Sequence, residues 1–185
     1  MSLSFDIPKE SKFTADGIAF DSQEEVEFYH WCKEAEKHGY IKDFLYHAES
    51  YPLSDRVAVK EEKMLKTKVK TVEKFLLHPH EYTPDFIIYP TEKFLEFDHD
   101  LRPYFEMIFI DVKGGFGIYH NQREFSINQK WMYSKYGIFV NKVVPEKFFA
   151  RTWVPAAATV SPKKKTARKK YAGFRRINNE IKLQF

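Results

Sequence analysis

Two acidic side chains and one lysine stand at the ends of apolar runs in the chain. One apolar run begins directly after Asp85, and another ends directly before Asp111, which lies two residues ahead of Lys113. In a strand, residues two apart point to the same face, so Asp111 and Lys113 project together while Val112 faces the core. If the two runs form neighbouring strands, Asp85 meets Asp111 and Lys113 in one cleft.

This set of residues has the composition of a site for Mg²⁺ or Mn²⁺. Carboxylate oxygens and a backbone carbonyl are hard ligands, which these ions prefer together with water. A bound ion lowers the pKa of a coordinated water and neutralises charge on a phosphate under attack. The lysine ammonium can orient the nucleophile and stabilise the developing negative charge. The predicted chemistry is phosphodiester hydrolysis, although Pro-Asp and Asp-x-Lys are short patterns that also arise by chance.

A third acid, Glu25, is placed to join this site from a helix. Ser22 and Glu25 have the spacing of a capping box, which predicts a helix that starts at Ser22 and stops at Gly39. An acid along an apolar stripe needs a partner, and a metal ion is one. The alternative is that Glu25 only caps the helix, and both roles can hold together. The side chains that share its face are Phe28, Tyr29, Cys32 and Ala35.

Short strands and a second helix must position these side chains. A helix is predicted over 125–135, capped by Gly137, and a last strand begins with Ile138-Phe139-Val140. Residues 60–74 alternate charged and apolar types and fit either a helical turn or an extended excursion. The runs that predict the other strands are 41–46, 51–59, 75–77, 82–89 and 107–110, and the continuous run 86–88 suits burial on both faces. The order helix, strands, helix, strand predicts an α/β domain with a mixed central β-sheet flanked by helices.

The chain divides into three parts by composition. Residues 1–19 are predicted to be an irregular lead-in, residues 20–150 the folded domain, and residues 151–185 a basic C-terminal tail. Ala156-Ala157-Ala158, between two prolines, resembles a linker into this tail. A length of 185 residues with 43% hydrophobic residues is enough for one domain with a sizeable core.

The net charge of +4 conceals an asymmetry along the chain. Residues 1–150 hold 20 Lys and Arg against 25 Asp and Glu, whereas residues 151–185 hold ten against one. A concentrated basic segment is typical of phosphate-backbone binding, which predicts DNA as the partner; the alternative is a solvated tail that only aids solubility. The predicted DNA-binding residues are Lys163, Lys164, Lys165, Arg168, Lys169, Lys170, Arg175 and Arg176.

Several other classes of protein are disfavoured. A single cysteine, Cys32, allows no internal disulfide framework or cysteine-based zinc site, and it is predicted to lie in the core. His78 and His80 alone do not make a closed zinc site. No apolar run has the length of a membrane span, and the N-terminus lacks the order of a signal peptide. We therefore expect a soluble cytoplasmic protein with no membrane partner.

Three strings of residues resemble the PD-(D/E)XK nuclease superfamily. They are Phe20-Asp21-Ser22-x-x-Glu25, Tyr82-Thr83-Pro84-Asp85-Phe86 and Asp111-Val112-Lys113-Gly114. Within it they look similar to small bacteriophage endonucleases, including the Holliday-junction resolvase of the endonuclease I type. The resemblance implies a restriction-endonuclease-like core in which Glu25, Asp85 and Asp111 bind Mg²⁺ or Mn²⁺ and Lys113 assists catalysis. Segments 60–74 and 91–106 look inserted relative to the smallest members.

The predicted function is a Mg²⁺-dependent DNA endonuclease that acts on branched or otherwise structured DNA, in the host cytoplasm if it is phage-encoded. Alternatives on the same fold are a transposition endonuclease subunit, a restriction-type enzyme and a head-completion nuclease. A non-catalytic DNA-binding protein is the alternative from another class, but such a protein has no reason to keep two acids and a lysine together. A resolvase cuts two strands symmetrically, which predicts a homodimer.

Overall fold

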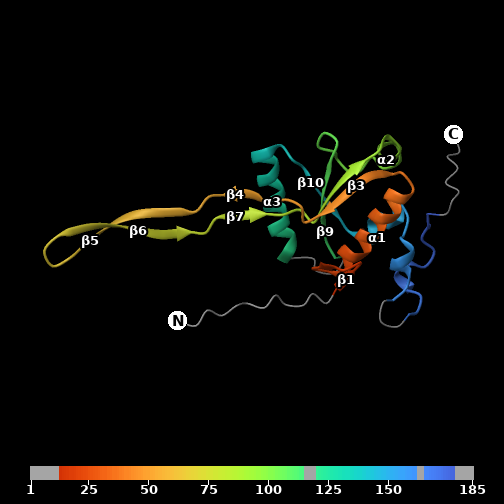
Figure 1. Cartoon of the computed structure of the whole chain (residues 1–185), viewed down its shortest axis with the longest axis horizontal. Coiled ribbons are helices and arrows are strands. Elements are labelled where there is room, and N and C mark those ends of the chain that lie inside the picture. The colour runs from red at the N-terminus through yellow and green to blue at the C-terminus, as the bar shows by residue number, and fades with distance from the viewer. Residues whose placement is uncertain (1–12, 115–119, 162–164, 178–185) are drawn as a thin grey trace.

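A four-stranded mixed sheet forms the centre of the protein in the computed structural model, which describes residues 13–114, 120–161 and 165–177. The strands lie in the order β10 (Val140–Val143), β9 (Ile108–Val112), β8 (Phe86–Pro90) and β3 (Ile41–Tyr46). β3 and β9 run antiparallel to β8, and β10 runs parallel to β9. The predicted α/β class with a mixed central sheet is confirmed (Figure 1).

Helices cover both faces of this sheet, as predicted. They are α1 (Gln23–Lys37) and α4 (Pro145–Arg151) on one face and α3 (His120–Tyr136) on the other. Ile88 and Ile110 pack in the cluster with α1, whereas Ile87 and Phe109 pack in the cluster with α3. Successive residues of one strand therefore enter opposite layers of the core. This alternation explains why the apolar run 86–88 is buried on both faces.

The helix termini follow local sequence signals. Ser22 is the N-cap of α1, and its hydroxyl accepts a hydrogen bond from the Glu25 N–H at 3.2 Å. α1 ends just before Gly39, and α3 ends just before Gly137, as predicted. α3 begins earlier than predicted, at His120 instead of Phe125, because its first turn is polar and lacks an apolar periodicity.

Two of the predicted strands are each broken in two. The run 51–59 divides into β4 (Tyr51–Ser54) and β5 (Val57–Met64), and the run 82–89 divides into β7 (His80–Tyr82) and β8. β4 pairs with β7, and β5 pairs with β6 (Val69–Leu77), which contains the predicted strand 75–77. Residues 60–74 therefore form parts of two extended strands joined by a turn, and not a helix. We call residues 57–77 the arm, because this hairpin projects far from the rest of the protein (Figure 1).

The segment 91–106 covers one end of the sheet. It contains α2 (Glu92–Phe97), whose Phe94 is fully buried. Asp98 is also buried, where it accepts a hydrogen bond from the Leu101 N–H at 3.2 Å and pairs with Arg151 at 2.8 Å. Among the helices that the structure describes, none is long and apolar enough to cross a membrane.

The predicted irregular lead-in contains a β-hairpin in its described part. β1 (Phe13–Ala15) and β2 (Ile18–Phe20) pair antiparallel across Asp16-Gly17. Both turn residues have positive φ, +50° and +80°, which is the conformation that favours Asp-Gly in tight hairpins. The prediction was wrong here because each strand has only three residues, although the Asp-Gly pair was a usable signal.

The basic C-terminal tail is folded onto the domain over its described residues. Trp153 is fully buried and stacks on Trp31, with ring centroids 4.9 Å apart. The predicted linker is instead part of the 3-10 helix η1 (Ala156–Thr159), and η2 (Lys169–Tyr171) buries the Tyr171 ring. The prediction of a linker was wrong, because Trp153 before this segment and Tyr171 after it are both buried in the core of the domain.

A buried carboxylate holds this C-terminal segment in place. Glu27 of α1 is 1% exposed, pairs with Arg168, and accepts a hydrogen bond from the Tyr171 hydroxyl. Lys170 Nζ lies 3.7 Å from the same carboxylate. Arg175 donates to the Thr152 carbonyl at 2.7 Å, at the end of α4. Three basic residues predicted to bind DNA thus have structural partners within the domain.

Replacing Arg168 by alanine tests this arrangement. The change removes the guanidinium beside the buried Glu27 carboxylate and leaves it with the Tyr171 hydroxyl and the more distant Lys170, and loss of a hydrogen bond to a charged group costs about 2 kcal/mol. We expect urea unfolding to show a free energy of unfolding lower by about that amount. The exposed neighbour Lys169 provides the control, because Lys169→Ala should change it by less than about 0.5 kcal/mol. Equal losses in the two variants would contradict the role of Glu27.

Candidate active site

Asp85 and Asp111 come together at the end of two adjacent strands. The register of β8 and β9 pairs Phe86 with Ile110, and each aspartate lies one residue beyond that pair. Asp85 Oδ2 accepts a hydrogen bond from the Val112 N–H at 2.6 Å, which ties this side chain to β9. The two acids therefore meet as the sequence predicted.

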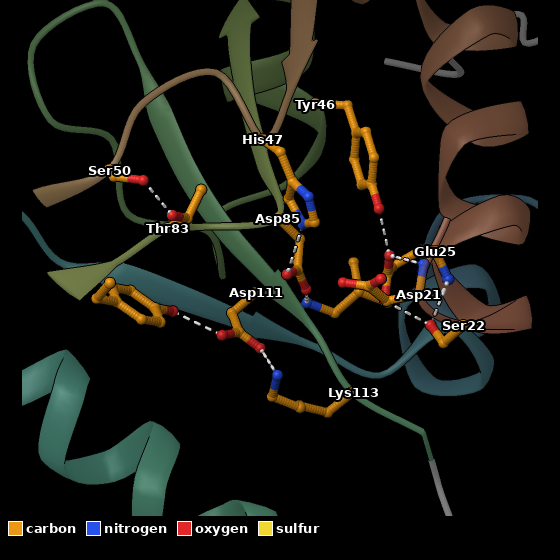
Figure 2. A network of polar contacts seen from close by, with 12 residues as sticks. Asp21, Ser22, Glu25, Tyr46, His47, Ser50, Thr83, Asp85, Asp111 and Lys113 are labelled. Atoms are coloured by element: carbon orange, nitrogen blue, oxygen red, sulfur yellow. Dashed lines mark hydrogen bonds and ion pairs between the residues drawn. The ribbon is translucent and has the colours of Figure 1, made fainter. Parts of the chain in front are cut away.

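Lys113 projects to the same side of the chain as Asp111. Its ammonium forms an ion pair with Asp111 Oδ1, and Asp111 Oδ2 accepts a hydrogen bond from the Tyr82 hydroxyl at 2.6 Å. Val112 is buried in the core cluster on the α1 side. The predicted alternation along this strand is confirmed, and Figure 2 shows Asp111 and Lys113 pointing toward one another.

Asp85, Asp111 and Lys113 line one pocket of about 220 Å³. The rest of its wall comes from β7, the loop after it and α3, with the residues His80, Glu81, Tyr82, Thr83, Glu124, Phe125 and Asn128. His80 Nε2 lies 2.8 Å from Asn128 Oδ1, so a hydrogen bond joins β7 to α3 across this wall. The pocket is therefore a polar site built from both strands and a helix.

Glu25 caps α1 and also belongs to a neighbouring acidic group. Its carboxylate accepts hydrogen bonds from the Ser22 hydroxyl at 2.7 Å and the Asp21 N–H at 3.1 Å. The Tyr46 hydroxyl donates to it as well, at 2.8 Å. The Glu25 carboxylate thus supports the N-cap of α1, but through the Ser22 hydroxyl and the Asp21 N–H and not through the Ser22 N–H of a standard capping box. Glu25 does not line the pocket, but it lies with Asp21 and His47 in a group whose ligand-type atoms are all within 4.8 Å of one another.

His47 connects this acidic group with Asp85. Its Nε2 lies 3.5 Å from Asp85 Oδ1, and its backbone N–H donates to the Asp85 carbonyl at 3.0 Å (Figure 2). Its φ is +46°, a left-handed conformation that is uncommon outside glycine. The hydrogen bond with Asp85 raises the pKa of His47, while burial acts in the opposite direction. The sequence did not single out His47, because no local pattern marks it. It lies beside Asp85 because it directly follows β3, which pairs with β8.

Like charges are crowded in the site. Burial and the negative charge of Asp85 raise the pKa of Asp111, although Lys113 and Tyr82 act in the opposite direction. Burial lowers the pKa of Lys113, but the Asp111 and Asp85 carboxylates outweigh it and leave that pKa raised. The negative charge of Glu25 raises the pKa of Lys113 further, by less than the two aspartates do. One lysine does not offset these carboxylates, so the residues fit an additional cation.

The donor set suits a hard divalent cation. Asp85 and Asp111 offer carboxylate oxygens in the pocket, and Glu25 and Asp21 offer others beside His47. Oxygen donors of this kind suit Mg²⁺ and Mn²⁺. Tyr82 and Asp21 were present in the strings that carried the family resemblance, but the sequence assigned them no role. Mg²⁺ or Mn²⁺ binding remains a prediction.

The residues predicted to bind DNA differ in their exposure and in their contacts with the domain. Lys163 and Lys164 lie outside the described residues, and Lys165 and Lys169 are exposed. Arg176 is exposed too and donates to Thr159 Oγ1 at 3.0 Å. Arg168, Lys170 and Arg175 have the structural partners given above.

Comparisons of the chain with models of protein families, with curated proteins and with solved structures found no match. The fold and the site themselves must therefore support any functional assignment.

Divalent metal should bind the folded protein and stabilise it. At about 100 times its Kd, an ion that binds only the folded state raises the free energy of unfolding by about 2.7 kcal/mol. We expect Mn²⁺ to raise the melting temperature of the parent protein and to have much less effect on Asp85→Asn. Asp43→Asn removes an exposed carboxylate from β3 and should respond like the parent. An equal shift in Asp85→Asn would place the metal elsewhere.

Proposed function

We propose that this protein is a divalent-metal-dependent DNA endonuclease with a restriction-endonuclease-like core. The observation that carries the proposal is the set Asp85, Asp111 and Lys113, which lines one pocket at the end of two paired strands. The order of α1, the antiparallel strands, α3 and the parallel strand β10 supports the same assignment. The family resemblance of the three strings around Glu25, Asp85 and Asp111 points in that direction as well.

In this proposal the carboxylates of Asp85 and Asp111 would hold the ion, and Glu25, in the neighbouring acidic group with Asp21 and His47, would add negative charge beside it. When bound, Mg²⁺ or Mn²⁺ supplies an activated water and neutralises charge on the phosphate. Lys113 stabilises the negative charge that develops on the phosphate oxygens and helps to orient the nucleophile. Tyr82 and His47 are positioning residues, because their contacts with Asp111 and Asp85 orient those carboxylates.

The charge of the pocket couples metal and substrate. Asp85 and Asp111, with Glu25 close by, face a single lysine, so the metal-free site repels a phosphate. A divalent cation reverses this repulsion. We therefore expect productive DNA binding at the pocket to depend on the ion, while contacts elsewhere on the protein do not.

Branched or otherwise structured DNA is the proposed substrate class, on the resemblance to small phage endonucleases. A homodimer would place two such pockets on two strands. Incubation with Mg²⁺ and a panel of linear, nicked, flap and four-way DNAs distinguishes a resolvase from a restriction-type or head-completion nuclease. Cleavage confined to branched substrates supports the resolvase, and equal cleavage of linear duplex argues against it.

Asp111→Asn tests the assignment of the pocket. This variant keeps the shape of the side chain and removes the charge that holds the ion, so cleavage should fall by at least about a hundredfold. Overall DNA affinity, measured with Ca²⁺ in place of Mg²⁺, should fall much less than cleavage, because contacts outside the pocket do not depend on the ion. Glu106→Gln, at an exposed acid away from the pocket, should cleave normally. Equal cleavage by Asp111→Asn and the parent would exclude this pocket as the active site.

Glu25→Gln separates the capping role of Glu25 from its role in the site. Loss of a capping interaction costs about 1 kcal/mol of stability and does not by itself reduce activity. We expect a folded protein with strongly reduced cleavage, measured alongside urea unfolding. Thr91→Ala is the control, because it removes hydrogen bonds to the Gly39 and Tyr40 carbonyls at a similar cost and lies outside the site. Full activity in Glu25→Gln would leave Glu25 with the capping role alone.

A further inference from the structure

The charges of the arm are sorted by face. The register of β5 and β6 places Lys63 opposite Lys70 and Lys60 opposite Glu73. Because side chains alternate along a strand, one face carries three lysines and one acid, and the other carries one lysine and two acids. We call the first the lysine face; it consists of Val59, Glu61, Lys63, Lys70, Val72 and Lys74. The opposite face consists of Lys60, Glu62, Met64, Val69, Thr71 and Glu73.

Two lysines of this face are directly opposed and lack a counter-charge. Like charges directly opposite across two strands destabilise the pairing. Within the described residues neither Lys63 nor Lys70 forms an ion pair with an acid, and the Glu61 carboxylate is paired with Lys74 at 2.8 Å. An anion lying across both ammonium groups would offset the repulsion. The lysine face of the hairpin therefore favours binding of an anionic group.

The arm continues from the wall of the pocket. β6 leads through His78-Pro79 into β7, whose residues His80, Glu81 and Tyr82 line the pocket. Figure 1 shows the arm extending outward beyond β4 and β7. The eight residues of β5 span about 27 Å at about 3.4 Å each. That length approaches one turn of B-DNA, which is about 34 Å.

We propose that the lysine face of the arm binds the phosphate backbone of the DNA whose strand enters the pocket. The proposal rests on the nuclease function proposed above and names the surface that holds its substrate. A two-stranded ribbon fits the major groove of B-DNA, and lysines bind the flanking phosphates as point charges. Residues 57–77 hold six lysines and three acids, although residues 1–150 are acidic overall.

The tip of the arm extends the same positive surface. Lys66 and Lys68 lie in the turn between β5 and β6, which is closed by a hydrogen bond from the Leu65 N–H to the Lys68 carbonyl at 2.8 Å. Both lysines are exposed. The arm therefore has exposed basic side chains at its tip as well as along one face. In the C-terminal segment, by contrast, several basic side chains form ion pairs or hydrogen bonds within the domain.

The double variant Lys63→Gln/Lys70→Gln tests this interface. Each phosphate contact contributes about 0.9 to the slope of log affinity against log salt, so the slope should become shallower by about two. Binding is measured by fluorescence anisotropy of a labelled DNA duplex with Ca²⁺ over a series of KCl concentrations. The matched control is Lys60→Gln/Lys147→Gln, which removes the same charge from the opposite face of the arm and from α4. Its slope should equal that of the parent.

The outcomes separate this proposal from the nuclease assignment. If both double variants have the same slope of log affinity against log salt, the arm is not a DNA-binding surface. The same conclusion follows if deletion of the arm converts a dimer into a monomer but leaves this slope unchanged. The latter result would assign the arm to a second copy, through exposed apolar residues such as Met64 and Val69. If the parent protein cuts DNA but the Lys63→Gln/Lys70→Gln variant has the same salt slope as the parent, only the proposal for the arm is refuted. If the salt slope becomes shallower in the Lys63→Gln/Lys70→Gln variant but the parent protein does not cut DNA in Mg²⁺, only the nuclease assignment is refuted.

Discussion

The antiparallel register of β8 and β9 is the constraint on which the site depends. It pairs Phe86 with Ile110 and so places Asp85 beside Asp111 at the end of the sheet. A slip of one residue would exchange the faces of every side chain on one strand and turn Asp111 toward the α1 layer. Such a slip is unfavourable because it would move the Asp111 carboxylate into the apolar layer where Val112 is packed. Apolar packing on both faces therefore builds the polar pocket at the strand ends.

Polar contacts at the strand ends then hold the charged residues where the core has placed them. Asp111 is held by Lys113 and Tyr82, and Asp85 by the Val112 N–H and His47. These contacts offset burial and carboxylate repulsion only in part, as the raised pKa of Asp111 indicates. Such an arrangement is unfavourable for stability alone, and sites of this kind are more often functional. Tyr82 also ends β7, so the same residue joins the pocket to the base of the arm.

The basic residues of the C-terminal segment and of the arm have different surroundings in the fold. In the C-terminal segment, Arg168 and Lys170 accompany the buried Glu27 carboxylate, because an unpaired charge at that depth would be costly. In the arm, Lys63 and Lys70 face each other with no acid between them. Clustering of basic residues in the sequence therefore does not tell which cations are paired with acids in the folded protein.

The sequence by itself determined the elements that depend on local signals. Capping and periodicity were enough to predict α1, the buried runs next to Asp85 and Asp111, and the shared face of Asp111 and Lys113. Only the tertiary structure decided the extended arm, the approach of His47 to Asp85, and the burial of Glu27 against Arg168. The contacts of His47 and Glu27 join residues far apart in the chain, and the arm, although a local hairpin, carries a mixed charge pattern that also fits a helical turn. Their positions follow from how strands pair and how the core packs, and no local pattern of residue types encodes either.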